Sequence, residues 1–311
     1  MFWKKWFEPK AFHEGYLPEK DGHRVFYREF GNKKGKPVLI FHGGPGGFCK
    51  PRHAKAFDLR KYKVIMFDQR GCGMSQPEGQ WNKNTTADLI DDAKRILDVC
   101  GIKDKVIVRG GSWGSTLALK FAETYPEKVE ALLLSQIFLA NNENKEWEEE
   151  GSRNFYPDIW EQIEEQVPDN DLLLSYYAGL ISSGEQEKQE KALTYYGAYE
   201  RILGSLNPRI VPKEADEKDV ASARIYMNYA NKRFYLKDDE LMKNIKKISW
   251  IPTLIVHNRL DFVCPLKGAY RLHKAMKNSK LVIVPERGHV GMLLHQTIRN
   301  EMKEFLKNIP S

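Results

Sequence analysis

Cysteine is scarce in this 311-residue sequence, and long apolar runs are missing. Cys49, Cys72, Cys100 and Cys264 are scattered without the spacing of metal ligands, so we expect reduced, partly buried thiols and no zinc site. No stretch approaches the ~18 consecutive apolar residues of a membrane span. The N-terminus also lacks the apolar core and cleavage site of a secretory signal. We therefore expect a cytoplasmic location.

A block of basic residues is missing as well, although the formal charge is +7. The 49 Lys and Arg residues are interleaved with 42 Asp and Glu residues, which is typical of a solvated surface and not of a nucleic-acid-binding stripe. Trp3 and Trp6 stand beside lysines, and we expect them to pack on the protein and not at a membrane interface. The composition thus predicts a globular protein without a nucleic-acid or membrane partner.

What the sequence does contain is a series of short apolar, β-branched runs that alternate with helical patterns. The runs cover residues 24–31, 37–44, 63–71, 105–112, 130–138, 252–258 and 280–288. Because they lack clean polar alternation, they suit strands covered on both faces. The sequence therefore predicts an α/β fold, a mostly parallel sheet with helices on both faces. Before the helical pattern of residues 89–97, Thr86 is the expected N-cap.

The alternation stops between residues 139 and 244, where glutamate, tyrosine and helix formers are frequent. An insertion of this kind within an α/β array is expected to form a helical cap on the carboxyl edge of the sheet, where open α/β folds bind ligands. We predict a discontinuous core of residues 1–138 and 245–311 with a helical cap of residues 139–244. No internal repeat or low-complexity linker is apparent.

Ser112 stands in the motif Gly-x-Ser-x-Gly, between an apolar strand pattern and a helical pattern. A sharp strand-to-helix turn needs small residues on both sides of its apex, and Gly110 and Gly114 supply them. Such a turn exposes the serine hydroxyl at the sheet edge, beside a helix N-terminus. Ser112 is therefore a candidate nucleophile, although the five-residue motif alone occurs often by chance.

A serine nucleophile needs a base and an acid that orients the base. His289 follows the last predicted strand and Asp261 follows the strand before it, which gives the order Ser, Asp, His. The structural alternatives are that Asp261 caps a helix starting near Pro265 and that His289 is an ordinary loop histidine. Three candidates at three strand ends favour a catalytic triad.

A tetrahedral intermediate would also need hydrogen-bond donors for its oxyanion. The glycine-rich stretch of residues 41–47 follows a predicted strand, and Gly44 within it is the candidate for one backbone donor. Trp113, directly after the nucleophile, is the candidate for the other. His42 has a second interpretation as a base, but its place in the glycine loop favours a structural hydrogen bond.

Four segments, "HGGPGG", "DQRGCGMS", "NTTADLIDD" and "GGSWGSTLAL", occur in this order between residues 42 and 119. In this combination the chain resembles the proline iminopeptidase family of α/β-hydrolases, which removes N-terminal proline from peptides. The likeness continues through "EGSRNFYPDIW" to "LDFVCP" and "GHV", from about residue 15 onward. The resemblance implies an α/β-hydrolase fold. "DQRGCG" is interpreted as a structural loop near the site.

By this resemblance Ser112, Asp261 and His289 match the family triad, and Gly44 and Trp113 match its oxyanion positions. The family binds the substrate ammonium with glutamates of its cap. One of them is matched by Glu200 in "YGAYE", whereas the second is replaced by Tyr226 in "ARIY".

Three further acids, Glu148, Glu149 and Glu150, stand where the family usually has aromatic residues. They offer possible compensation for the lost carboxylate, but a solvated helix face is the expectation.

The sequence thus predicts a serine aminopeptidase that releases N-terminal proline or another small residue from short peptides. No metal or organic cofactor is needed for this chemistry, and a monomer or small homo-oligomer is expected. Because Tyr226 replaces an acid, the alternative is an esterase, lactonase or arylamidase with the same triad and no need for a free amine. A ligand-binding pseudohydrolase is a further, different class.

Overall fold

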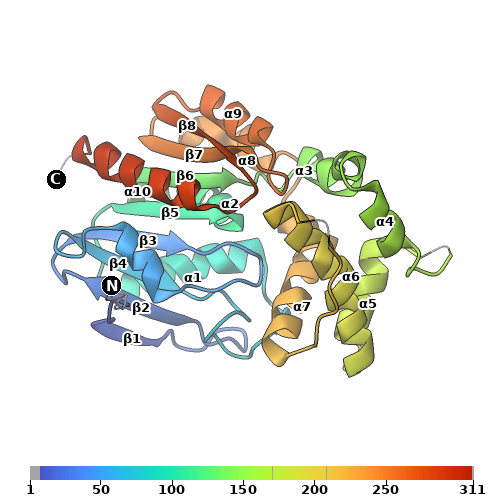
Figure 1. Ribbon diagram of the computed structural model, residues 1–311. Helices are drawn as coiled ribbons and strands as arrows, with labels where there is room; N and C mark the ends of the chain where they lie inside the picture. Colours follow the sequence, from blue (N-terminus) through green and yellow to red (C-terminus); the bar gives the residue numbers. More distant parts are fainter. Residues whose placement is uncertain (1–7, 170, 208, 310–311) are drawn as a thin grey trace, which may run out of the picture.

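The computed structural model describes residues 8–169, 171–207 and 209–309. Trp3 and Trp6, whose packing was predicted above, lie outside the described residues. Figure 1 shows a sheet with helices on both of its faces and a separate group of helices at one end of it. Among the described residues, no helix combines the length and the apolar character that crossing a membrane requires.

The sheet has eight strands in the order β1-β2-β4-β3-β5-β6-β7-β8. They are β1 (His13–Tyr16), β2 (Phe26–Gly31), β3 (Lys36–Phe41), β4 (Tyr62–Phe67), β5 (Val106–Ser112), β6 (Val129–Ile137), β7 (Thr253–Leu260) and β8 (Ser279–Arg287). The pairs β1-β2 and β2-β4 are antiparallel, and all others are parallel. The α/β prediction and its seven strands are confirmed, whereas the polar edge strand β1 was not predicted from the apolar pattern.

Two apolar clusters lie on opposite faces of the sheet. On one face α1 (Thr86–Val99), α2 (Trp113–Thr124), α8 (Glu240–Asn244) and α9 (Leu266–Ala275) pack against the strands. On the other face the cluster includes residues of α10 (Met292–Lys307) and of the short 3₁₀-helix at Pro51–Ala56. Both faces of the central strands are therefore covered, which explains their continuous apolar sequence.

Helix α1 begins one residue earlier than expected. Its N-cap is Thr85, and the predicted N-cap Thr86 is the first helical residue. The Thr85 hydroxyl accepts a hydrogen bond from the backbone N–H of Asp88, and the Asp88 carboxylate accepts one from the Thr85 N–H, which completes a capping box. The predicted N-cap was one residue too late because either of the two adjacent threonines fits the sequence pattern of an N-cap.

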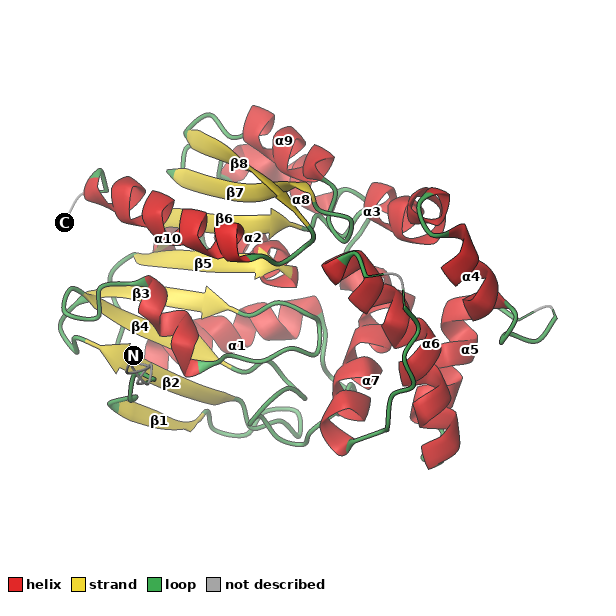
Figure 2. Cartoon of the chain, in the orientation of Figure 1, coloured by secondary structure: helices red, strands yellow, loops and turns green. Residues whose placement is uncertain are grey.

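Between β6 and β7 the described residues form helices and no strand of the sheet (Figure 2). These helices are α3 (Asn142–Glu146), a π-helix at Trp147–Gly151, α4 (Pro157–Glu164), α5 (Leu173–Ser182), α6 (Gln186–Ser205), α7 (Glu217–Asn231) and α8. Helices α4 to α7 share an apolar cluster of their own, rich in tyrosine. Helix α8 differs, because its residue Leu241 and the adjacent Ile245 belong to the apolar cluster on the sheet face that α2 covers. The boundaries at residues 139 and 244 stay a prediction.

Candidate active site

Ser112 occupies a strained turn at the end of β5. Its backbone angles are φ 55° and ψ −131°, a region that non-glycine residues rarely adopt. A Cβ atom at Gly110 would overlap the carbonyl oxygen of Gly114, and one at Gly114 would overlap that of Phe41. Both glycines are thus required by close backbone approach, as the motif predicted. The turn presents the serine hydroxyl at the sheet edge directly before α2.

The three predicted triad residues lie within hydrogen-bond distance of one another. Oγ of Ser112 is 3.0 Å from Nε2 of His289. Nδ1 of His289 is 2.8 Å from Oδ2 and 3.0 Å from Oδ1 of Asp261. The strands β5, β7 and β8 bring together residues up to 177 positions apart in sequence. With this geometry His289 can take the proton of Ser112, and Asp261 can orient and stabilise the charged imidazole.

Asp261 is held by the loop that follows β7. Its Oδ1 accepts hydrogen bonds from the backbone N–H groups of Val263 and Cys264, at 3.0 and 2.9 Å. These bonds fix the orientation of the carboxylate. Helix α9 has Pro265 as its N-cap and receives no side-chain cap hydrogen bond, so Asp261 does not cap it. The carboxylate is available to His289.

The loop that carries His289 is hydrogen-bonded to α6 and to β6. The backbone N–H of His289 donates to the carbonyl oxygen of Gly204 in α6 at 3.1 Å. Its own carbonyl accepts from Nε2 of Gln136 in β6 at 2.7 Å. Gln136, which the sequence analysis did not single out, also lies in the positive-φ region, at 49°. Helix α6 therefore helps to fix the position of the imidazole.

The two proposed oxyanion donors lie beside Ser112. Gly44 lines the same cavity as the serine, and its φ of 127° favours glycine. Trp113 is the first residue of α2, so no residue of the helix precedes it by four positions to accept its N–H. Its indole is fully buried and donates to Oε1 of Gln69 at 2.9 Å. Both backbone N–H groups stay candidate donors.

His42 makes hydrogen bonds within the core. Its Nδ1 lies 2.8 Å from the carbonyl oxygen of Gly43, and its Nε2 accepts from the backbone N–H of Gln69 at 3.0 Å. Burial lowers the pKa of the His42 imidazole. The structural role expected for His42 is confirmed. Gln69 also donates to the His42 carbonyl, so it links the glycine loop to Trp113.

The loop "DQRGCG" is likewise built for support. The guanidinium of Arg70 is buried and donates to Asp92 of α1, with an Nε to Oδ2 distance of 2.6 Å. Asn84 donates to the Arg70 carbonyl at 2.8 Å and accepts from the Tyr229 hydroxyl of α7 at 2.9 Å. The expected structural role is confirmed, and the loop connects the core to the helices above it.

Comparisons with known proteins agree with this fold and site. A family model described as the alpha/beta hydrolase fold matches residues 36–296. The chain is 38% identical over 290 residues to a proline iminopeptidase of Xylella fastidiosa strain Temecula1, covering 91% of this chain and 92% of that protein. It is 37% identical to a proline iminopeptidase of Arabidopsis thaliana, with coverages of 96% and 81%. The chain belongs to the proline iminopeptidase family of α/β-hydrolases.

Solved structures show the same architecture at lower sequence similarity. A proline iminopeptidase-related protein from Thermus thermophilus has a TM-score of 0.59 at 18% identity, covering 96% of this chain and 98% of that one. An esterase from Rhodococcus sp. ECU1013 has a TM-score of 0.57 at 16% identity, with coverages of 96% and 99%. These likenesses confirm the α/β-hydrolase fold.

Glu200 was predicted to bind the substrate, and the structure places it in a cavity with Ser112. Glu200 lies on α6, one turn before Gly204, and lines the same small cavity as Ser112. Its side chain is exposed within the cavity. Desolvation by the neighbouring protein atoms, followed by the charge of Glu148, raises the pKa of Glu200 to about 7, while the Tyr226 hydroxyl counteracts the rise.

Glu148 corrects an expectation from the sequence. Glu149 and Glu150 are exposed as predicted, but Glu148 turns inward and lines the cavity with Ser112 and Glu200. The Tyr226 hydroxyl donates to its Oε1 at 2.8 Å. Burial raises the pKa of Glu148, and the hydrogen bond from Tyr226 partly offsets this. The physical reason is that successive side chains of a helix point in different directions around its axis, so three adjacent glutamates cannot all lie on one solvated face, and Glu148 is the one that lines the cavity.

Proposed function

We propose that this protein is a serine aminopeptidase that releases N-terminal proline, or another small residue, from short peptides. Two relatives named proline iminopeptidase match the chain over 92% and 81% of their own length. The observation that favours this activity most is the pair of carboxylates, Glu148 and Glu200, in the cavity that Ser112 also lines. A cavity with two acids suits a substrate that carries a positive charge next to the scissile bond.

In the proposed reaction, the Ser112 hydroxyl attacks the carbonyl carbon of the first residue while His289 takes its proton. Asp261 stabilises the imidazolium, and the N–H groups of Gly44 and Trp113 bind the oxyanion. His289 then protonates the leaving amine, which departs as the shortened peptide. Water hydrolyses the acyl-enzyme with His289 again as base, and the free amino acid leaves. No metal or organic cofactor takes part in this proposal.

The substrate ammonium would lie between Glu148 and Glu200. Two ionised carboxylates that line one cavity repel each other, so a cation between them is favourable. Tyr226 keeps the Glu148 carboxylate in place, and Glu148 thus supplies the second acid that the sequence at position 226 lacks. The cavity is small, about 60 Å³, and Phe138, Tyr199 and Phe234 contribute to its lining. Such walls suit an apolar ring the size of proline.

The site would act on short peptides in the cytoplasm, without a nucleic-acid or membrane partner and as a monomer or small homo-oligomer. Residues 139–244 would serve as the cap that selects the substrate. The π-helix and α6 belong to this segment, and they provide the two acids.

A substrate panel tests the proposal. Prolyl and alanyl arylamides, their N-acetylated counterparts and a simple aryl ester would be assayed with the wild type and Ser112→Ala. We expect N-acetylation to lower kcat/KM at least tenfold, and Ser112→Ala to abolish turnover of every substrate. An unchanged rate on acetylated arylamides would instead support the esterase, lactonase or arylamidase alternative. Saturable binding of these compounds without any turnover would support the pseudohydrolase.

A further inference from the structure

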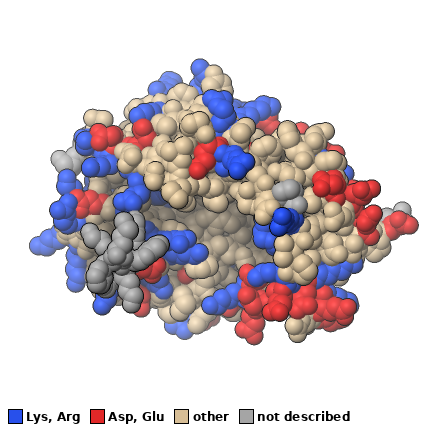
Figure 3. Space-filling model, viewed as in Figure 1, with Lys and Arg blue, Asp and Glu red and all other residues tan. Residues whose placement is uncertain are grey.

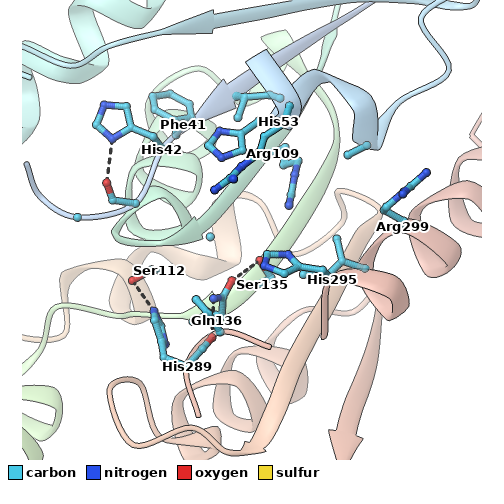
Figure 4. Close-up of a pocket in the computed structure, with 18 of the residues that line it drawn as sticks. Phe41, His42, His53, Arg109, Ser112, Ser135, Gln136, His289, His295 and Arg299 are labelled. Carbon is cyan, nitrogen blue, oxygen red and sulfur yellow. Dashed lines mark hydrogen bonds between the residues drawn. The ribbon is translucent and has the colours of Figure 1, made fainter. Parts of the chain in front are cut away.

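A second and larger cavity opens on the core side of Ser112. It measures about 1050 Å³ and is lined by the end of β3, the 3₁₀-helix at Pro51–Ala56, β5 and α10, as well as by Ser112 and His289. Figure 4 shows Arg109 and His53 on one side of it, His295 and Arg299 on α10, and Ser112 with His289 on the other. The cavity thus extends from Ser112 to side chains of the 3₁₀-helix and of α10.

Positive charge predominates in this cavity. Four cationic side chains line it, Arg52, Lys55, Arg109 and Arg299, against two carboxylates, Glu8 and Glu200. Figure 3 shows the face that carries α10 hollowed near its centre, with Lys and Arg side chains on both sides of the hollow. The charge therefore favours an anionic ligand.

Arg109 is the most unusual member of this group. It is half-buried in the central strand β5, and no carboxylate of the described residues lies within ion-pair distance of its guanidinium. Burial alone lowers its pKa to about 10. The other interior arginine, Arg70, is paired with Asp92 at 2.6 Å. A half-buried guanidinium that lines a cavity and has no carboxylate partner among the described residues favours the binding of an anion there.

The two cavity histidines do not supply a balancing charge. The pKa of His53 is lowered to about 4 by burial and then by Arg109 and Arg52. The pKa of His295 is lowered by burial and by the same two arginines, with Glu286 acting in the opposite direction. Both imidazoles are thus neutral at pH 7 and can donate one N–H each to a bound anion.

The position of Arg109 relative to Ser112 indicates which part of a substrate it can reach. Three residue steps along β5 separate the Cα atoms of Arg109 and Ser112, which is about 10 Å at ~3.3 Å per step. An extended peptide advances by ~3.3–3.6 Å per residue. The leaving part of a short peptide, one to three residues long, therefore has the length to span from the scissile bond toward Arg109.

We propose that Arg109, assisted by Arg52 and Arg299, binds the C-terminal carboxylate of a short peptide on the leaving-group side of Ser112. This inference rests on the proposed aminopeptidase activity. A planar guanidinium binds a carboxylate through two parallel hydrogen bonds. The enzyme then recognises both ends of its substrate, the ammonium between Glu148 and Glu200 and the carboxylate at Arg109. Di-, tri- and tetrapeptides with a free carboxylate are its preferred substrates, such as those that other peptidases release.

The experiment compares prolyl di-, tri- and tetrapeptides with their C-terminal amides. In the wild type we expect kcat/KM to be about tenfold higher for the free acids, mainly through KM, which corresponds to ~1.4 kcal/mol. In Arg109→Met this ratio should fall to about 1, and in Arg299→Gln, an exposed helix position, it should fall partly. The matched control is Arg60→Gln, because Arg60 is exposed, pairs with Asp58 and lies outside the cavity lining. Its ratio should stay at about ten.

Equal kcat/KM for acids and amides in the wild type would overturn the inference, as would an unchanged ratio in Arg109→Met. Cleavage of prolyl arylamides shows separately whether the proposed function holds. Calorimetric binding of Pro-Gly-Gly and its amide to Ser112→Ala needs no turnover. Equal affinity for the two would overturn the carboxylate site even if the catalytic proposal failed. Melting temperatures show whether Arg109→Met is folded.

Discussion

The Tyr226 hydroxyl donates a hydrogen bond to Oε1 of Glu148 over 2.8 Å, across 78 positions of sequence. This bond joins α7 to the π-helix and places the Glu148 carboxylate in the cavity of Ser112. Tyr226 acts on Glu200 as well, since its hydroxyl opposes the rise in that residue's pKa. Tyr226 therefore positions another carboxylate, and in the proposed function it need not contact the substrate ammonium itself.

The first prediction concerns the two carboxylates. Glu148→Gln and Glu200→Gln should each raise KM for prolyl arylamide about tenfold, because each removes one charge from the proposed ammonium site. Tyr226→Phe should give a smaller rise, since it frees Glu148 without neutralising it. The aryl ester, which has no ammonium, should show little change in KM for any of the three.

Glu149→Gln is the matched control, because Glu149 is adjacent, exposed and paired with Lys145 on the surface. If Glu148→Gln and Glu149→Gln had the same KM, Glu148 would have no part in amine binding. Equal effects of Glu200→Gln on the arylamide and the ester would make Glu200 structural.

The second prediction is a pH dependence of amine recognition. With a pKa of about 7, Glu200 is mostly protonated at pH 6 and mostly ionised at pH 8. KM for prolyl arylamide should therefore fall as pH rises through 7, and rise again once the substrate ammonium loses its proton. Glu148, Tyr226 and His289 face the same carboxylate and act on this titration.

Measuring the arylamide and the ester side by side at each pH cancels the effects common to both. The ratio of their kcat/KM values should increase between pH 6 and 8 in the wild type. In Glu200→Gln the ratio should be flat or follow only the titration of Glu148. A ratio independent of pH in the wild type would exclude Glu200 as the titrating group.

The third prediction concerns stability. Glu123 of α2 is buried, and among the described residues neither of its carboxylate oxygens has a hydrogen-bond partner. Burial raises its pKa to about 8, with smaller effects of Lys120 and Glu240. Because the folded pKa is above the unfolded one, this group favours the folded state at low pH. Its contribution is lost as pH rises toward 8, by up to ~1.4 kcal/mol per pH unit.

Glu123→Gln should consequently raise the melting temperature at pH 8 by several degrees and have little effect at pH 5. Glu127→Gln, at an exposed position near the end of the same helix, should change neither. Thermal unfolding followed by circular dichroism at the two pH values gives the comparison. A Glu123→Gln protein that is no more stable than the wild type at pH 8 would contradict the assignment of a buried, unpaired acid.

Much of the site could be predicted because its residues stand at strand ends. Ser112, Asp261 and His289 each follow an apolar run, and the carboxyl ends of parallel strands meet at one edge of the sheet. The two glycines beside Ser112 identified the turn for a related reason, since backbone contact there leaves no room for a Cβ atom. His42 and the loop at Arg70 were also interpreted correctly from their local context.

Glu148 and Arg109 were not predictable in this way. Three consecutive glutamates are typical of a solvated segment, and the sequence does not show which of them faces the interior where it contacts Tyr226. Arg109 appears as a polar interruption of a strand, and nothing in its neighbourhood shows that a cavity lined by α10 lies beside it. Likewise, Thr85 and Thr86 fit the N-cap pattern equally well in the sequence, and only the backbone angles show that Thr85 caps α1.

The sequence by itself determined the sheet, the elbow and the order of the triad, because strand patterns and glycine requirements are local. Only the tertiary structure decided which charges face Ser112. Glu148 and Glu200 come from different helical segments, and Arg52, Arg109 and Arg299 from three parts of the core. Their distances depend on how helices and strands pack, and burial then changes the free energy of each charge.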